Sequence, residues 1–364
     1  MKNILISGAS IAGLATAWWM DHLGYKVTVV ELAAAPRTAG AAVDIRDDTT
    51  AIVKRMGLYH ALRSKTLQVQ LMEFKNADDV TEASIVVPES HEDIEIERPE
   101  FMEIMLADLK NRVDFIFNDR ITAFVETDTD ITVTFKNAPQ QSFHLVLGCD
   151  GMHSGVRKLW FGEEAEYAHF LEAYFSITIV NKLLIPTSTM QGYNSPGKAV
   201  MLNAYNGKTD IIFCFVAEEE IPYHYRDVEQ QRQLILKNFT GGGWRTDELL
   251  AEIEKADNFY FDKFCQIKMQ SWSKGRIALV GDAAYCASPA AGMGASLSIA
   301  GAAALADALV KHNGNFENAF KEYNNSLRPF IEEVQATALN NVRKTFLPRT
   351  EEEIHQRNTH MTGF

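Results

Sequence analysis

The sequence predicts an α/β protein in which a domain of alternating strands and helices is interrupted by an antiparallel β-sheet and followed by a C-terminal helix. Three observations predict this fold class. A strand, a glycine-containing turn and a helix open the chain; residues 166–265 are rich in β-branched and aromatic residues; and a strand followed by a long small-residue helix returns after residue 266. The 364 residues, 46% of them hydrophobic, are enough for two intertwined domains.

The first element is a strand–helix–strand unit of the Rossmann-like kind. A strand over Asn3–Ser7 is followed by the turn "GASIAG", a helix over about 12–23 that ends at Gly24, and a second strand over 26–31. Gly8 permits the turn and Gly13 lets the helix pack closely on the sheet, although Ser10 stands where a second glycine is usual. The free N–H groups of the helix N-terminus suit a pyrophosphate, and the acidic Glu31 suits a ribose. Because an acidic residue disfavours a 2′-phosphate, the expected tight ligand is FAD or NAD.

The second motif is "CDGMHSGVR", residues 149–157, which directly follows an expected strand over 143–149. An aspartate at the carboxyl end of a parallel strand lies in the crevice where open α/β sheets bind ligands. Asp150 is therefore a candidate ligand-binding residue, and Arg157 could pair with a carboxylate or phosphate. The alternative is an ordinary Asp-Gly turn with a helix capped by Ser154.

The third motif is "GDAAYCASPAAGMGAS", residues 281–296, after the strand "RIALV". Asp282 at the strand end can accept hydrogen bonds from sugar-alcohol hydroxyls. Pro289 stiffens the loop, while Gly292 and Gly294 allow the backbone to approach a flat ring closely. The N-terminus of the following helix would stabilise negative charge on that ring.

Composition excludes several classes of partner. The chain has 35 basic and 48 acidic residues, a net charge of −13, so we expect neither nucleic acid nor an anionic membrane as a partner. The four cysteines are scattered without metal-binding spacing, and we expect reduced thiols in a cytoplasmic protein with no metal site. Residues 292–310 are long enough to span a bilayer, but their Ala, Gly and Ser content favours a buried helix.

The ordered motifs "GxSxxG", "DGxxSxxR" and "GDAAxxxxPxxGxG" resemble those of the single-component (group A) FAD-dependent monooxygenases with the para-hydroxybenzoate hydroxylase fold, a GR2-type fold. "GASIAGL", "AVDIR" and "KRMGL" are similar to the branch of aromatic and antibiotic hydroxylases that includes the tetracycline-inactivating enzymes. The resemblance covers most of the chain and is diffuse from about residue 166 to 265. It implies an oxidoreductase that uses FAD, with NADPH or NADH as transient reductant, and O2. An aromatic or polyketide-like small molecule would be hydroxylated through a flavin C4a-hydroperoxide.

The resemblance also implies site residues and domain limits. Residues 1–70, 99–165 and 266–310 would form the FAD-binding domain, 71–98 and 166–265 the substrate-binding β-sheet domain, and 311–364 a C-terminal helix and polar tail. The residues implied to contact the cofactors are Gly8, Ser10, Ile11, Ala12, Gly13, Glu31, Leu32, Arg37, Asp44, Arg46, Arg98, Asp150, Arg157, Gly281, Asp282, Pro289, Gly292, Met293, Gly294 and Ala295. For Arg46 and Arg98 the alternative is a surface cation. Tyr285 departs from the family pattern, which has histidine there.

The substrate pocket is less well marked. Phe213 and Phe215 fall on one face of a strand by alternation and, with Pro289, are candidates to line it, although packing in a core is the commoner role of such residues. No nucleophile–base pair is found, and flavin chemistry needs none. A reductase or halogenase of the same fold and a catalytically silent flavin-binding protein stay as alternatives; the WxWxIP signature of halogenases is absent. A monomer or weak homodimer is expected.

Overall fold

A computed structural model describes residues 2–36, 40–46, 48–90 and 92–361. The chain divides into two compact units, which are described separately here. Unit 1 comprises residues 1–66, 92–169 and 265–336, and unit 2 comprises residues 67–91, 170–264 and 337–364. The sequence analysis gave residues 311–364 a part of their own, whereas this division assigns 311–336 to unit 1 and 337–364 to unit 2.

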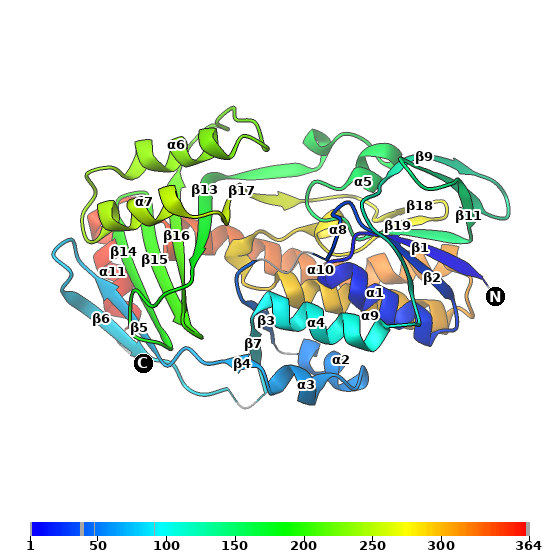
Figure 1. The fold of residues 1–364 in the computed structure, drawn as a ribbon, viewed down its shortest axis with the longest axis horizontal. Coiled ribbons are helices and arrows are strands. Elements are labelled where there is room, and N and C mark those ends of the chain that lie inside the picture. Colours follow the sequence, from blue (N-terminus) through cyan, green and yellow to red (C-terminus); the bar gives the residue numbers. More distant parts are fainter. Residues whose placement is uncertain (1, 37–39, 47, 91, 362–364) are drawn as a thin grey trace. The chain divides into compact units, whose positions relative to one another are not determined.

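Unit 1 is built on a six-stranded sheet, and its α/β class is as predicted (Figure 1). The strand order is β18-β19-β12-β1-β2-β8. β19 (Ile277–Leu279), β12 (Leu145–Gly148), β1 (Asn3–Ser7), β2 (Lys26–Val30) and β8 (Asp114–Ile116) are parallel, and β18 (Ser273–Lys274) pairs antiparallel at the edge. The first crossover is α1 (Ile11–His22), which begins directly after the glycine turn because Gly8 and Gly13 permit the close approach.

The core of unit 1 contains the long helix α9 (Gly294–Lys311), which packs against α1. By length and composition α9 could cross a membrane, but two thirds of it is buried within the fold, as expected of a core helix. Small residues let it approach its neighbours: a Cβ on Gly301 would lie 1.8 Å from the Tyr285 hydroxyl. That hydroxyl is 3.1 Å from the hydroxyl of Tyr323, which donates to the Leu279 carbonyl. Tyr285, the departure from the family pattern, therefore fills the interior beside α9.

The remaining elements of unit 1 surround this sheet. Its helices are α2 (Asp48–Arg55), α3 (Tyr59–Arg63), α4 (Arg98–Leu109), α5 (Gly155–Trp160), α8 (Asp282–Tyr285) and most of α10 (Phe316–Asn340). Two small sheets complete it: β3 (Val43–Ile45), β7 (Ile94–Ile96) and β4 (Thr66–Leu67), and the antiparallel β9 (Ile121–Glu126), β10 (Ile131–Phe135) and β11 (Gln141–Phe143).

Unit 2 contains a seven-stranded sheet in the order β17-β13-β16-β15-β14-β5-β6. Its strands are β17 (Phe259–Ile267), β13 (Ala168–Val180), β16 (Lys208–Val216), β15 (Lys198–Tyr205), β14 (Thr189–Ser195), β5 (Leu71–Lys75) and β6 (Thr81–Val86). The neighbouring strands β13, β16, β15 and β14 pair antiparallel, as their content of β-branched and aromatic residues predicts. β14 and β5 pair parallel.

The two faces of this sheet are covered differently. The helices α6 (Val228–Phe239) and α7 (Thr246–Lys255) lie along one face, which we call the helical face (Figure 1). The opposite face carries Met72, Met190 and Met201, and we call it the methionine face. A π-helix (Asn341–Phe346) and α11 (Glu351–Met361) belong to this unit. Residues 351–361 of the expected polar tail form a helix. The three glutamates in its first turn stabilise it through their interaction with the helix dipole.

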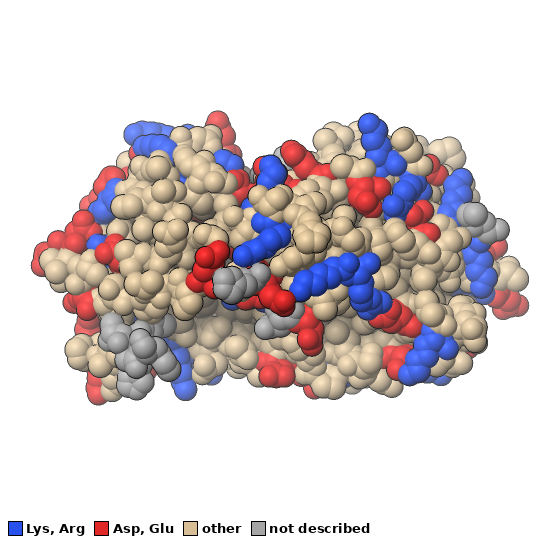
Figure 2. All heavy atoms as spheres, turned by 90° about the horizontal axis from the view of Figure 1, so that it is seen from below, with Lys and Arg blue, Asp and Glu red and all other residues tan. Residues whose placement is uncertain are grey.

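Charged side chains are mixed on the surface. On the face that Figure 2 shows, lysine and arginine side chains lie beside acidic ones. Ion pairs such as Arg55–Asp307 and Lys54–Glu92 bring opposite charges together on the exposed surface. The basic side chains visible on this face are therefore interspersed with acidic ones and do not form one continuous patch there.

Gly301→Ala tests the packing of α9. In an ordinary helix this change adds about 1 kcal/mol of stability. Here we expect a loss of about 1–3 kcal/mol, because the new methyl group overlaps the Tyr285 hydroxyl. Urea unfolding of the variant and the wild type measures this change in the free energy of unfolding. Tyr285→Phe, which removes that hydroxyl, should recover part of the loss in the double variant, and strictly additive effects would contradict this packing.

Candidate functional site

The three sequence motifs follow three neighbouring strands of unit 1. β1, β12 and β19 are adjacent and parallel, so the loops after Ser7, Gly148 and Leu279 leave the sheet at one edge. Backbone hydrogen bonds join them: the Cys149 N–H donates to the Ser7 carbonyl at 2.8 Å, and the Val280 N–H donates to the Gly148 carbonyl at 2.9 Å. The motifs are therefore brought together at the carboxyl edge of the sheet, where open α/β sheets bind ligands.

The first loop can form only because two of its residues lack side chains. A Cβ on Gly8, whose φ is +102°, would lie 2.5 Å from the Cys149 carbonyl oxygen, and one on Gly13 would lie 1.8 Å from the Gly8 carbonyl oxygen. Ile11 and Ala12, in the first turn of α1, are buried. Ser10 is the N-cap residue of α1 but makes no side-chain capping bond. The N–H groups of the first helical turn thus have no capping side chain and can bind a phosphate.

Glu31, expected to contact a ribose, also holds this loop. Its carboxylate accepts hydrogen bonds from the backbone N–H groups of Ala9 and Ala33, both at 2.8 Å. The glycine loop is thereby attached to the end of β2. The neighbouring Leu32 is 55% exposed, and Arg37 lies outside the described residues.

Arg98, the first residue of α4, lies between the first and third motifs. Its Nη2 donates to the Ser10 hydroxyl at 2.7 Å, and its side chain fills the space beside Gly40, where a Cβ would lie 2.9 Å from Arg98 Cδ. Burial raises the pKa of the nearby Asp282, and the positive charge of Arg98 partly opposes that shift. Arg98 is thus held among the first and third motifs by these contacts and is not a solvated surface cation. The Ser10–Arg98 bond gives the serine in the glycine motif a structural role.

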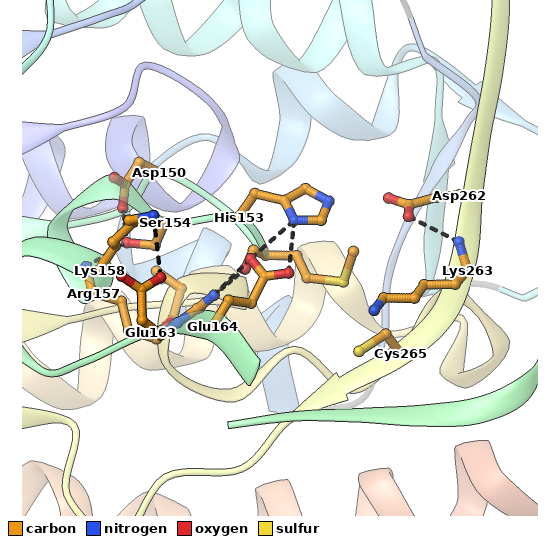
Figure 3. Close-up of polar contacts among 12 residues, drawn as sticks. Asp150, His153, Ser154, Arg157, Lys158, Glu163, Glu164, Asp262, Lys263 and Cys265 are labelled. Carbon is orange, nitrogen blue, oxygen red and sulfur yellow. Dashed lines mark hydrogen bonds and ion pairs between the residues drawn. The ribbon is translucent and has the colours of Figure 1, made fainter. Parts of the chain in front are cut away.

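The second motif differs from the expectation (Figure 3). The Asp150 carboxylate accepts from the Ser154 hydroxyl at 2.5 Å and from the Val156 N–H at 3.0 Å, so it fixes the start of α5. Arg157 is 1% exposed and donates to the carbonyls of Met152 and Ala283, and it pairs with Glu164 at 3.2 Å. The guanidinium of Arg157 thus joins the second motif to the third and pairs with a carboxylate, one of the two partners expected for it, while its expected coenzyme contact stays a prediction. Glu164 also contacts His153 at 3.0 Å.

The third motif presents open backbone at the start of α9. Gly281, with φ +68°, packs so closely on α1 that a Cβ would lie 2.9 Å from the Ala12 Cβ. Pro289, Gly292 and Gly294 are exposed, and a Cβ on either of these glycines would meet no atom within 4 Å. Met293 precedes α9 without a side-chain cap, and Ala295 is buried. Ser288 has a φ of +82° and ψ of 148°, a conformation that costs energy for any residue but glycine.

Asp44 lies on β3, and Arg46 directly follows this strand. They form an ion pair at 2.9 Å, and Arg46 is half exposed. Ser296, which the sequence analysis did not single out, anchors this segment: its hydroxyl donates to the Asp44 carbonyl at 3.1 Å and accepts from the Arg46 N–H at 3.2 Å. A buried serine in the first turn of a small-residue helix gives no distinctive sequence signal.

Phe213 and Phe215 take the commoner of the two roles considered for them, packing in a core. Both are buried on the helical face of the sheet, with the Phe213 ring 4.7 Å and the Phe215 ring 6.3 Å from that of Phe239 in α6. They are core residues of unit 2. The opposite, methionine face borders a cavity. Methionine carries no strand-face signal of its own, so the sequence analysis missed it.

The residues present fit a flavin dinucleotide. Two uncapped helix N-termini, α1 and α9, belong to loops of the same sheet edge. Gly8, Gly13 and Gly281 let these loops pack together where a Cβ would collide with neighbouring atoms. Open backbone at Gly292 and Gly294 suits a flat ring. Within the described ranges, no group of three or more His, Cys, Asp or Glu side chains could hold a metal ion.

Comparisons with known proteins agree with this geometry. The profile of the family described as FAD binding domain matches residues 1–338. The chain is 32% identical over 340 residues to a flavin-dependent monooxygenase of Legionella longbeachae serogroup 1 (strain NSW150), covering 91% of this chain and 86% of the relative. Crystal structures of the tetracycline destructases Tet(51) and Tet(55) superpose with TM-scores of 0.87 and 0.88 at 32% and 31% identity. These matches cover 100% of this chain and 96% and 95% of the two structures.

Asp282→Asn tests the third motif. Because burial raises the pKa of Asp282 above 3.8, folded protein binds this proton more tightly than unfolded protein does. The free energy of unfolding of the apoprotein should therefore fall as pH rises from about 4 through the raised pKa. We expect the variant to lose that slope while it loses much of its FAD.

The matched control is Asp307→Asn, which removes an exposed charge from the far part of α9. It should keep both the pH dependence and the FAD content of the wild type. Unchanged FAD content in Asp282→Asn, measured by its visible absorbance, would exclude Asp282 from the cofactor site.

Proposed function

Because this chain belongs to the FAD-binding-domain family and is an FAD-dependent monooxygenase, we propose that it hydroxylates an aromatic or polyketide-like small molecule. FAD is its cofactor, and NAD(P)H and O2 are the co-substrates typical of the family. The substrate class is supported by the kinship with two tetracycline destructases over the whole chain.

The observation that carries the proposal is the meeting of three loops at one sheet edge, with Arg98 in contact with Ser10 and electrostatically coupled to Asp282. We assign the N-terminus of α1, with Gly8, Ser10 and Gly13, to the pyrophosphate of FAD, and Glu31 to its ribose. Asp282 is assigned to the ribityl chain, and the loop from Pro289 to Ala295 to the flavin ring. Arg98, Asp44 and Arg46 complete this proposed site.

Bound FAD supplies the redox chemistry: a hydride from NAD(P)H reduces it, and with O2 one oxygen atom enters the substrate while the other leaves as water. The chain supplies orientation and electrostatics. The positive end of the α9 dipole, which has no capping side chain, would stabilise negative charge on the ring edge. Burial raises the pKa of the Asp282 carboxyl. When protonated, this group would accept hydrogen bonds from hydroxyl groups without the cost of burying a negative charge.

We further propose a cytoplasmic protein that is a monomer or a weak homodimer. Support for the compartment comes from the cysteines, because all four are buried and free of disulfides. Burial raises the pKa of Cys149 to about 12, which keeps this thiol protonated and unreactive.

The visible spectrum and NAD(P)H consumption of the purified protein test the proposal. We expect a yellow protein whose NADPH or NADH oxidation in air accelerates with a phenol, a tetracycline or another polyketide, and a product heavier by one oxygen atom. Mass spectrometry under 18O2 identifies the source of that atom.

The other outcomes separate the alternatives. Turnover that continues without oxygen would indicate a reductase, and a chlorinated or brominated product a halogenase. A flavin spectrum with no substrate effect across the screen would indicate a catalytically silent flavin-binding protein.

A further inference from the structure

A cavity of about 80 Å³ lies within unit 2, between the methionine face of the sheet and the C-terminal segment. Its apolar lining includes Met72, Met190, Met201, Phe74 and Phe346. Because a water molecule needs roughly 10–15 Å³ by this measure, the space suits a group the size of a single ring. Methionine side chains are flexible and polarisable and make favourable contacts with aromatic rings. The shape and lining therefore suit a flat, apolar group.

Two charged residues line this cavity, Glu73 and Arg357. The Glu73 carboxylate already pairs with Lys75 at 3.3 Å and accepts from the Gln191 side chain at 2.7 Å. Arg357 belongs to α11, and its guanidinium lies 4.9 Å from the centre of the Phe74 ring. Arg357 donates four hydrogen bonds, all to neutral oxygens: the Asn194 side chain and the Thr345 carbonyl at 2.8 Å each, and the Asn358 side chain at 3.1 and 2.8 Å. In the part of the chain that the structure describes, no carboxylate forms an ion pair with it.

This arrangement leaves a partly desolvated positive charge without compensation. Burial lowers the pKa of Arg357 to about 10, and no nearby acidic group opposes that shift. A half-buried cation is unfavourable unless an anion pairs with it. An anionic ligand would remove this cost, whereas a neutral ligand of the same shape would not.

The wall that carries Arg357 is fixed to the sheet. The Asn194 side chain donates to the Phe346 carbonyl, and the Gly197 N–H donates to the Pro348 carbonyl, both at 2.8 Å. Arg349 pairs with Glu172 of β13 at 2.7 Å. The guanidinium is thus held in place before any ligand binds, which lowers the entropic cost of binding.

We infer that this cavity binds the acidic ring of the substrate, an aromatic or enolic ring bearing a carboxylate, phenolate or enolate, with Arg357 as the residue that selects the anion. This inference rests on the proposed function and deepens it, because it narrows the substrate class to acidic ring compounds. Arg357 is a specificity-determining residue and takes no part in the redox chemistry.

Isothermal titration calorimetry with salicylate and its neutral amide, salicylamide, tests the inference on the oxidised holoenzyme without NAD(P)H. We expect the wild type to bind salicylate more tightly than salicylamide. Arg357→Gln should raise the dissociation constant of salicylate by about tenfold or more and change that of salicylamide by less than about twofold, because only the anion interacts with the positive charge. Arg357→Lys should retain part of the preference.

The matched control is Lys198→Gln. Lys198 is the cation that lines a second cavity of unit 2, of about 120 Å³ on the helical face, and it donates to the Asn238 carbonyl. This variant should bind both compounds as the wild type does. Met201→Trp, which fills the cavity under the C-terminal segment, should abolish binding of both compounds even if Arg357→Gln folds poorly.

The inference would be overturned if Arg357→Gln lost affinity for both compounds equally, or if Lys198→Gln lost as much affinity for salicylate. A wild type that binds neither compound would overturn it too. The proposed function fails by a different result, the absence of any oxygenated product. Because binding is measured without turnover, the two failures are distinguishable.

Discussion

The close approach of three backbone loops is the constraint on which the rest of unit 1 depends. Gly8 can lie against the Cys149 carbonyl, and Gly13 against Gly8, only because neither glycine has a Cβ. Gly281 makes the same kind of approach to Ala12. Together these contacts place the starts of α1 and α9 at one edge of the parallel sheet. Two helix N-termini at one edge create a field that favours an electron-rich ligand, and no basic side chain is needed to generate it.

The fold and the cofactor loops could be predicted from sequence because their signals are local. Glycines at fixed spacing after a strand specify a turn, and an aspartate or glutamate at a strand end is positioned by the strand itself. Gly8, Asp282 and the α9 N-terminus were found in this way. The contact between Ser10 and Arg98 could not be found, since it joins residues 88 positions apart and depends on how α4 packs.

Features that depend on tertiary packing could not be settled from the sequence. Arg157 follows a cofactor-associated motif, but whether a cation faces a ligand or the interior depends on its neighbours, here the Ala283 carbonyl and Glu164. Phe213 and Phe215 were placed on one face by alternation, which is correct, but alternation does not reveal which face the helices cover. The helix over residues 351–361 is strongly polar, and among its side chains over 351–359 the one buried apolar side chain is Ile354. Its amphipathic signal is therefore weak.

Three arginines of this chain show what decides the use of a buried cation. Arg157 is almost fully buried and paired with Glu164, so its charge is already compensated and it acts as a structural link. Arg98 donates to a serine hydroxyl and opposes the raised pKa of Asp282, so part of its charge acts on the site. Arg357 is oriented by neutral oxygens alone. Neutral acceptors fix the direction of a guanidinium without cancelling its charge, and it is this combination that gives a protein a selective site for an anion.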